Sequence, residues 1–342
     1  MKIKIIDNSE TKRLVSENYN YHFDKKTGMF HRWGKTQDED PQVGIPEIAD
    51  IEITTICNGP ENVLCPECYK KNSHVGTNMS IETYEKILDK LPLSITQVAF
   101  GADANLSSNP DIWKIMEATR KRGVVPNITV ADVDDYTADM LTTYCGAVAV
   151  SRYANKNLCY DSIKRLTDRG MKQVNIHIIL SATSFDMVLE TISDMRNDPR
   201  LAKMNAIVFL SLKQKGRGYN KETMSMEQFS EIVQIALDSG ISFGFDSCGS
   251  HKFIRSIQGH DNFKNMVQSV EPCESSLFST YIDVDGMFHP CSFSPKTKIW
   301  GYDGLDVVNC TDFLKDIWYH ERTVAFRKSL LEGGRNCPLY NI

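Results

Sequence analysis

The sequence predicts an α/β fold in which parallel strands alternate with helices, and three observations support this prediction. Six apolar runs of strand length recur between residues 51 and 212. Six stretches with helical periodicity alternate with them, and Gly123, Gly170 and Gly240 stand just past helix ends, where a left-handed residue is favoured. Six such units in succession imply parallel strands joined by right-handed crossovers. Both an open doubly wound sheet and a partial (β/α) barrel satisfy this pattern.

The expected elements follow one another from residue 51 onward. Strands are expected at residues 51–56, 95–100, 124–130, 147–151, 173–180 and 205–212. Helices are expected at residues 80–90, 109–122, 136–144, 158–169, 185–196 and 225–239. Ser80 suits the N-cap of the first helix, and Asn109 followed by Pro110 suits the start of the second. In both candidate architectures the chemistry lies beyond the carboxyl ends of the strands.

The segment before this core has a different pattern. Residues 15–34 alternate around a turn at Gly28, which predicts a β-hairpin because glycine can supply the positive φ of such a turn. The polar stretch 35–48 carries two prolines and an acidic run and is interpreted as a connector. We expect this short N-terminal hairpin segment to shield one end of the main domain.

The pattern changes again after residue 246. Helical periodicity over residues 252–270 leads into a second hairpin at 279–291, whose turn is Asp285 followed by Gly286. A last helix is expected at about residues 312–331. The chain is therefore divided into three parts: residues 1–48, 49–245 and 246–342.

Composition excludes several classes of protein. Of the 342 residues 41% are hydrophobic and 24% are charged, which is ordinary for a globular protein and sufficient for a barrel core with an added lobe. A net charge of −5 argues against nucleic acid as a partner. No apolar run reaches membrane-spanning length, and the first residues lack the features of a secretory signal, so we expect a cytoplasmic protein without a membrane partner. In that compartment ten cysteines indicate metal binding rather than five disulfides.

Three cysteines, Cys57, Cys65 and Cys68, lie in one loop directly after the first predicted strand. Three thiolates can hold three corners of a four-iron, four-sulfur cube, and the fourth iron then stays open for a ligand that is not protein. The alternative is a structural zinc site built on Cys65 and Cys68, because a lone C-x2-C pair binds zinc or serves as a redox pair at least as often. No second such pair and no closely spaced histidine pair completes a tetrahedral zinc site, which favours the iron–sulfur hypothesis.

This cysteine loop after a first strand, opening a run of β-α units, resembles the radical S-adenosylmethionine (radical SAM) superfamily. The resemblance implies a partial (β/α)6 barrel of TIM type in which Cys57, Cys65 and Cys68 hold a [4Fe–4S] cluster that binds SAM. It also implies that SAM is reductively cleaved to a 5′-deoxyadenosyl radical, which abstracts a hydrogen from the substrate. The electron for this reaction is expected from an external donor such as flavodoxin or ferredoxin.

The resemblance also implies contacts with SAM. The family's aromatic residue near adenine usually precedes the third cysteine, whereas here Tyr69 follows it, and seven residues instead of three separate the first two cysteines. Asp103 ends the counterpart of the family's glycine-rich motif, where it is available to the SAM ammonium group. Alternative interpretations are a strand cap for Ser151 and a basic, solvated loop after Leu212. The SAM contacts carried over are Tyr69, Gly101, Ala102, Asp103, Ser151, Arg152 and Leu212.

The spacing of Cys273 and Cys291 around the second hairpin resembles the SPASM and twitch C-terminal extensions of radical SAM enzymes. A hairpin turn between them would bring both thiolates to one auxiliary [4Fe–4S] cluster. The dense cysteine run that gives full SPASM domains another cluster is missing, so a single auxiliary cluster of the twitch type is implied. We favour Cys248 and Cys337 as its further ligands, with Cys310 in reserve.

Three remaining residues receive a structural interpretation. Cys145 and Cys159 lie in or beside predicted helices and are expected to be small buried residues of the core. His177 alternates within the fifth predicted strand, where a satisfied core histidine is favoured over a catalytic one.

The resemblance suggests a class of substrate. Radical SAM enzymes with twitch or SPASM extensions mostly modify ribosomally made peptides or protein side chains. We therefore expect peptide modification, by crosslinking, epimerisation or backbone excision. Residues 1–48 are too short for a leader-recognition domain, so a separate leader-binding protein is expected to present the peptide. The alternatives are a radical SAM dehydrogenase or other modifier of a small molecule and, from another class, a zinc-stabilised binding protein without radical chemistry.

Overall fold

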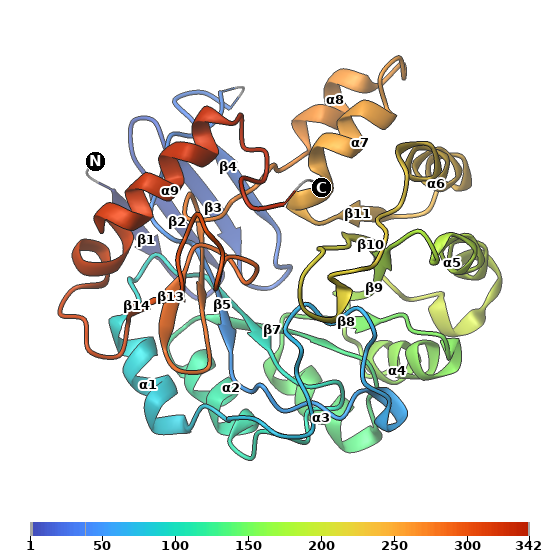
Figure 1. The fold of residues 1–342 in the computed structure, drawn as a ribbon, viewed down its shortest axis with the longest axis horizontal. Coiled ribbons are helices and arrows are strands. Elements are labelled where there is room, and N and C mark those ends of the chain that lie inside the picture. The colour runs from blue at the N-terminus through green and yellow to red at the C-terminus, as the bar shows by residue number, and fades with distance from the viewer. Residues whose placement is uncertain (1–2, 38, 341–342) are drawn as a thin grey trace.

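A ten-stranded sheet forms the centre of the computed structural model, which describes residues 3–37 and 39–340 (Figure 1). Eight of its strands run parallel, and seven of these lie side by side in the order in which they follow one another along the chain. These seven strands are β5 (Ile48–Glu52), β6 (Gln97–Gly101), β7 (Val125–Val130), β8 (Ala147–Ser151), β9 (Val174–Leu180), β10 (Ala206–Ser211) and β11 (Phe243–Phe245).

One helix follows each of the first six parallel strands, and Figure 1 shows these helices in an arc along the outer side of the sheet. They are α1 (Ile81–Lys90), α2 (Ile112–Lys121), α3 (Asp135–Tyr144), α4 (Lys156–Asp168), α5 (Phe185–Asn197) and α6 (Met226–Ser239). The prediction of an α/β fold with a large parallel sheet is confirmed. Among the described residues, no helix is both long and apolar enough to cross a membrane.

Local sequence signals explain most of the helix ends. Ser80 caps α1 by accepting a hydrogen bond from the backbone N–H of Thr83 at 3.2 Å, and Gly240 ends α6 with a φ of 64°. The prediction that Asn109 begins the second helix is wrong, because α2 begins at Ile112. The side-chain oxygen of Asn109 accepts a cap-like hydrogen bond from the backbone N–H of Asp111 at 2.9 Å. Its amide nitrogen also donates to the backbone oxygens of Ile53 and Met79, at 2.7 and 2.9 Å. It therefore ties the end of β5 to the start of α1.

The first parallel strand ends earlier than predicted. The apolar run 51–56 was expected to be the strand, but β5 covers Ile48–Glu52. Beyond Ile53 the chain leaves the sheet, and Thr54 and Ile56 form only single bridges, with Asn78 and Ser73. The loop that carries the three cysteines therefore starts directly above the carboxyl end of the sheet.

The N-terminal segment is larger than the predicted hairpin. The expected hairpin is present as β3 and β4, but it belongs to a four-stranded antiparallel sheet. Lys12 of β2 donates hydrogen bonds to the backbone oxygens of Leu93 and Ile95, which precede β6. This sheet therefore closes the amino-terminal end of the parallel strands, opposite the cysteine loop, as expected. Its strands are β1 (Lys4–Asp7), β2 (Thr11–Val15), β3 (Asn20–Asp24) and β4 (Phe30–Trp33).

The C-terminal hairpin joins the main sheet. Strand β12 (Ser279–Ile282) pairs parallel with β5 and antiparallel with β13 (Met287–His289), which pairs with the short β14 (Leu305–Asp306). The predicted hairpin with a turn at Gly286 is confirmed, and Gly286 has a φ of 78°. The hairpin therefore extends the main sheet beyond β5, which is the strand that the cysteine loop follows.

The helices of this C-terminal part are shorter than predicted. The periodic stretch 252–270 forms two helices, α7 (Ser250–Ser256) and α8 (Phe263–Gln268). The expected last helix is divided into a π-helical turn, Leu314–Trp318, and α9 (Glu321–Glu332). The division lies at His320, whose Nδ1 accepts a hydrogen bond from the backbone N–H of Arg322 at 3.2 Å and so caps a new helix.

A buried ionic network joins the N-terminal sheet to the C-terminal part. The side chain of Arg32 in β4 is only 1% exposed and pairs with Glu47 at 2.6 Å, Glu271 at 2.7 Å and Glu274 at 3.2 Å. Its guanidinium also lies 3.9 Å from the ring centroid of Phe278. Burial raises the pKa of Glu47 to about 7, and the charge of Arg32 acts in the opposite direction.

Replacing Arg32 with methionine is therefore expected to lower the free energy of unfolding by about 3–5 kcal/mol, because it leaves Glu47 buried without a counter-charge. Urea unfolding followed by far-UV circular dichroism measures this change. Arg13→Met, at an exposed position of the same sheet, is the matched control and is expected to change the free energy by less than about 0.5 kcal/mol. Equal stability of the two variants would show that the network contributes nothing.

Candidate active site

A cavity of about 520 Å³ opens at the carboxyl ends of the parallel strands. The ends of β5, β6, β7, β8 and β10 line it, together with the cysteine loop after β5. This is the place where the fold class leads us to expect the chemistry.

The three loop cysteines, Cys57, Cys65 and Cys68, all line this cavity. The backbone N–H of Gly59 donates a hydrogen bond to the sulfur of Cys57 at 3.3 Å. Burial raises the pKa of Cys65, and a hydrogen bond with the side chain of Tyr153 acts in the opposite direction. Tyr153 follows β8 and lines the same cavity, but nothing in the sequence had marked it as a partner of the loop. Hydrogen bonds to the sulfurs are among the factors that set the reduction potential of an iron–sulfur cluster.

The seven residues between Cys57 and Cys65 fold into a compact turn. Gly59 has a φ of 73°, and a Cβ at this position would lie 1.9 Å from the backbone oxygen of Val63, so only glycine fits. A short 3-10 turn, Pro60–Asn62, follows. The spacing between Cys57 and Cys65 is longer than in the commonest radical SAM loop, but this turn folds the extra residues compactly. Both cysteines therefore still line one cavity.

The loop after β10 fastens the cysteine loop in place. The side chain of Arg217 donates hydrogen bonds to the backbone oxygens of Cys65 at 2.7 Å and Asn72 at 2.8 Å, and its backbone N–H donates to that of Cys68 at 2.9 Å. Gly216 has a φ of 63°, and a Cβ there would lie 2.3 Å from the backbone oxygen of Tyr69. The close approach of the two loops therefore requires glycine.

Thiols are the donor groups that iron–sulfur clusters and zinc both bind. All ten cysteines are free of disulfides. A tetrahedral zinc ion needs its thiolates about 3.8 Å apart, because each Zn–S bond is about 2.3 Å. In the described part of the chain, no three His, Cys, Asp or Glu side chains approach closely enough to hold one ion. A four-iron cube binds each cysteine at a separate corner and so accepts a wider spacing.

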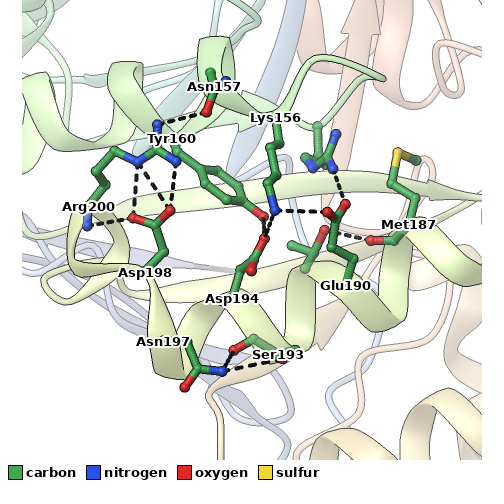
Figure 2. A network of polar contacts seen from close by, with 12 residues as sticks. Lys156, Asn157, Tyr160, Met187, Glu190, Ser193, Asp194, Asn197, Asp198 and Arg200 are labelled. Atoms are coloured by element: carbon green, nitrogen blue, oxygen red, sulfur yellow. Dashed lines mark hydrogen bonds and ion pairs between the residues drawn. The ribbon is translucent and has the colours of Figure 1, made fainter.

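Six of the seven residues predicted to contact SAM line this cavity. They are Tyr69, Gly101, Ala102, Asp103, Ser151 and Leu212. Arg152 is not among the lining residues, because its guanidinium is turned toward α5 and pairs with Glu190 at 2.8 Å. Figure 2 shows Glu190 in a polar network with Lys156 and Asp194, on the side of the sheet that the helices cover.

Asp103 carries an incomplete hydrogen-bond set. One of its carboxylate oxygens accepts from the backbone N–H groups of Ser107 at 3.0 Å and Ser108 at 3.3 Å. The other oxygen is buried and has no partner among the described residues, although the side chain lines the cavity. Because a buried oxygen without a partner costs free energy, this position favours a cationic ligand.

The C-terminal part contributes a wall to the cavity. The ring of Tyr69 packs against Phe293, with ring centroids 4.4 Å apart. Lys70 pairs with Glu52 at 3.1 Å, and the hydroxyl of Tyr281 donates to the same carboxylate at 3.1 Å. No pattern in the sequence marks Glu52, Lys70 and Tyr281 as neighbours, because they come from a strand, a loop and a distant hairpin that only the fold brings together.

A second cavity, of about 310 Å³, lies beside the first. The four cysteines favoured for an auxiliary cluster line it, whereas Cys310 does not. Burial raises the pKa of the Cys273 thiol, and it raises that of Cys291 to about 11. Thiols kept protonated in this way need a bound cation to stabilise their thiolate form. The four cysteines are Cys248, Cys273, Cys291 and Cys337.

Shared residues form the boundary between the two cavities. Asp50, Lys213, Asp246 and Phe293 line both of them, and Lys213 pairs with Asp246. Cys145 and Cys159 lie elsewhere, in the hydrophobic core, as predicted from the sequence.

No protein-family model matches the chain, and no curated protein matches it. The crystal structure of Streptococcus suis SuiB bound to S-adenosylmethionine matches with a TM-score of 0.65, over 93% of this chain and 88% of that chain. The chain shares the fold of SuiB. At 12% sequence identity the likeness concerns the fold alone.

Two further solved structures give weaker likenesses. BtrN in complex with AdoMet and 2-DOIA has a TM-score of 0.45 and 12% identity, over 85% of this chain and 89% of that chain. A radical SAM methyltransferase from Sphaerobacter thermophilus has a TM-score of 0.44 and 11% identity, over 71% of this chain and 75% of that chain. Neither likeness is strong enough to bear on the fold.

His177 of β9, for which a satisfied core histidine was favoured over a catalytic one, lines the cavity of this SuiB-like fold. Its Nδ1 lies 3.4 Å from the hydroxyl of Thr129. Burial lowers the pKa of His177 to about 4, so the ring is neutral at pH 7.

Acid is therefore expected to destabilise the protein through His177. Because the pKa is about 4 in the folded chain and about 6.5 when unfolded, the unfolded state binds more protons between these values. Up to about 3 kcal/mol of stability, present above pH 6.5, is lost as the pH falls toward 4. Urea unfolding at pH 7.5 and pH 5 measures the difference. His177→Gln is expected to reduce this pH dependence, and an unchanged dependence would contradict the assignment.

Proposed function

We propose that this chain is a radical SAM enzyme, which reductively cleaves SAM and uses the resulting 5′-deoxyadenosyl radical to abstract a substrate hydrogen. One observation carries the proposal: three free cysteines and Asp103, one of whose carboxylate oxygens has no partner among the described residues, line one cavity at the carboxyl ends of the parallel strands. The fold is shared with SuiB, whose crystal structure was obtained with bound SAM, and this supports the proposal.

Each part of the cavity has a role in this proposal. Cys57, Cys65 and Cys68 would hold a [4Fe–4S] cluster, which when bound supplies the electron that cleaves the sulfonium. The free oxygen of Asp103 would accept hydrogen bonds from the SAM ammonium group. Tyr69, packed against Phe293, would close the cavity and exclude water from the radical.

We also propose that the second cavity holds an auxiliary [4Fe–4S] cluster of the twitch type. Four thiols line this cavity, which is the number that a fully ligated cluster needs. Full ligation suits electron transfer rather than substrate binding. The ligands would be Cys248, Cys273, Cys291 and Cys337, and Cys310 would take no part.

The proposed substrate is a ribosomally made peptide, with the product a crosslink, an epimer or an excised backbone. Glu52, Lys70 and Tyr281 supply hydrogen-bonding groups on the cavity wall that a peptide backbone can use. The N-terminal sheet packs against the end of the parallel strands opposite the cavity. A separate leader-binding protein is therefore proposed to present the peptide.

The test of this function is anaerobic incubation of the reconstituted protein with SAM and dithionite, followed by chromatography and mass spectrometry. Formation of 5′-deoxyadenosine over more than one turnover per chain supports the proposal. Absence of this product from protein that contains its full complement of iron would contradict it.

Replacing Asp103 with asparagine is expected to weaken SAM binding at least about tenfold, because a hydrogen bond to a charged group contributes about 1.5–3 kcal/mol. Isothermal titration calorimetry of the anaerobic protein measures the affinity. Asp134→Asn is the matched control, since Asp134 caps α3 and does not line the cavity, and asparagine caps equally well. Equal affinities for SAM in the two variants would remove Asp103 from the site.

A further inference from the structure

A third pocket, of about 460 Å³, lies at the surface, and every charged side chain that lines it is basic. The four cations are Lys71, Lys215, Arg217 and Lys296. The whole chain has a net charge of −5, so this pocket is a local reversal of the overall charge. Such a concentration of one sign attracts ligands or partners of the other sign.

The basic charge of this pocket is not neutralised within the described residues. None of the four cations forms an ion pair with a described carboxylate, and Lys71 and Lys296 are exposed. Lys215 donates hydrogen bonds to the backbone oxygens of Phe293 at 3.0 Å and Pro295 at 3.2 Å. These contacts fix the position of Lys215 and leave its charge unpaired.

The pocket borders both thiol-lined cavities. Arg217 lines this pocket and the first cavity, and its Nε donates to the backbone oxygen of Cys65. Tyr340 lines this pocket and the second cavity. This surface pocket therefore shares a lining residue with each of the two cysteine-lined cavities.

The lining favours a protein partner over a small anion. Tyr219 is 69% exposed at the pocket, and tyrosine is enriched where proteins bind one another. The pocket is also wide for a single phosphate or carboxylate, and its two exposed lysines lie on separate loops, after the cysteine loop and after β13. An extended acidic surface can meet both lysines at once.

We propose that this basic pocket is the docking site of a small acidic electron-carrier protein of the flavodoxin or ferredoxin kind. The inference rests on the proposed function, which requires an electron from outside the chain. In each transfer the carrier loses one electron and the iron–sulfur group held by the cysteines gains it, and no atom changes partner. Charge complementarity at the pocket would speed the encounter and orient the carrier toward the cysteines.

The test compares two double charge reversals in the iron-loaded protein. Lys71→Glu with Lys296→Glu alters the pocket, whereas Lys121→Glu with Lys172→Glu makes the same change of charge at the amino-terminal end of the strands. Binding of an oxidised flavodoxin and of a ferredoxin is measured by calorimetry at low and at high salt. We expect the pocket variant to bind at least about tenfold more weakly at low salt, and the control variant to change less than about threefold. Salt should weaken binding of the unaltered protein most.

Several outcomes would overturn this docking site. These are no binding of either carrier to the unaltered protein, equal loss in the two variants, or binding of inorganic phosphate at the pocket without binding of a carrier. Dithionite separates this inference from the proposed function, because it reduces the protein without a carrier. If dithionite supports cleavage of SAM while the pocket variant binds carriers normally, only the docking site is wrong. If dithionite supports no cleavage, the proposed function itself fails.

Discussion

Replacing Cys57, Cys65 and Cys68 together with alanine is expected to abolish reductive cleavage of SAM. These three thiols line the cavity at the carboxyl ends of the strands, and Cys57 already receives a hydrogen bond from the backbone N–H of Gly59. Without them no cluster can be held there, and the electron has no route to the sulfonium. The measurement is the yield of 5′-deoxyadenosine with dithionite as reductant, which should fall to the level of protein-free samples.

The matched control for this variant is Cys145→Ala with Cys159→Ala. Both thiols lie in the hydrophobic core, and neither lines one of the two cavities. The control is expected to lose some stability and to retain cleavage of SAM. If 5′-deoxyadenosine still forms in the triple variant, the three loop cysteines do not hold the catalytic cluster.

The second large effect is expected from Cys273→Ala with Cys291→Ala. Both cysteines line the smaller cavity, where their thiols are kept protonated by burial until a cation binds. Their loss should remove one cluster, about four irons per chain, from protein reconstituted without oxygen. Cleavage of SAM should persist at a reduced rate, because the first cavity keeps its own three thiols. Iron and sulfide are measured per chain.

Cys310→Ala is the control for the smaller cavity, because Cys310 is buried but does not line it. This variant should keep its full iron content. An unchanged iron content in the Cys273 and Cys291 variant, or a loss of four irons in Cys310→Ala, would require a different ligand set.

Much of the fold could be predicted because the core repeats one simple pattern. The strand predicted at residues 147–151 is β8 itself, and most helices agree within a few residues, since caps such as Ser80 and glycines such as Gly240 mark helix ends locally. Expectations failed where tertiary contacts replace local signals. Asn109 accepts a cap-like hydrogen bond from Asp111, but its amide also bridges two other segments of backbone, and α2 begins only at Ile112.

Only those residues of the site that can be recognised by their type and position in the sequence could be predicted. Cysteines stand out in a sequence, and the seven that were predicted as cluster ligands each line one of the two cavities, as does Asp103, the acidic residue after the second predicted strand. Arg152 was expected to contact SAM, but its guanidinium pairs with the carboxylate of Glu190 in the neighbouring helix α5. The pairing of Lys70 with Glu52 spans a loop and a strand, and no local pattern encodes it.

The most direct test of the central claim is the metal content of the unaltered protein purified without oxygen, together with its electron paramagnetic resonance spectrum. We predict brown protein with about eight irons and matching sulfide per chain, and no zinc. After reduction with dithionite, its spectrum should change on addition of SAM, because SAM would bind the open iron. Colourless protein with stoichiometric zinc, or a reduced spectrum that SAM leaves unchanged, would contradict the claim that three cysteines hold a cluster open to SAM.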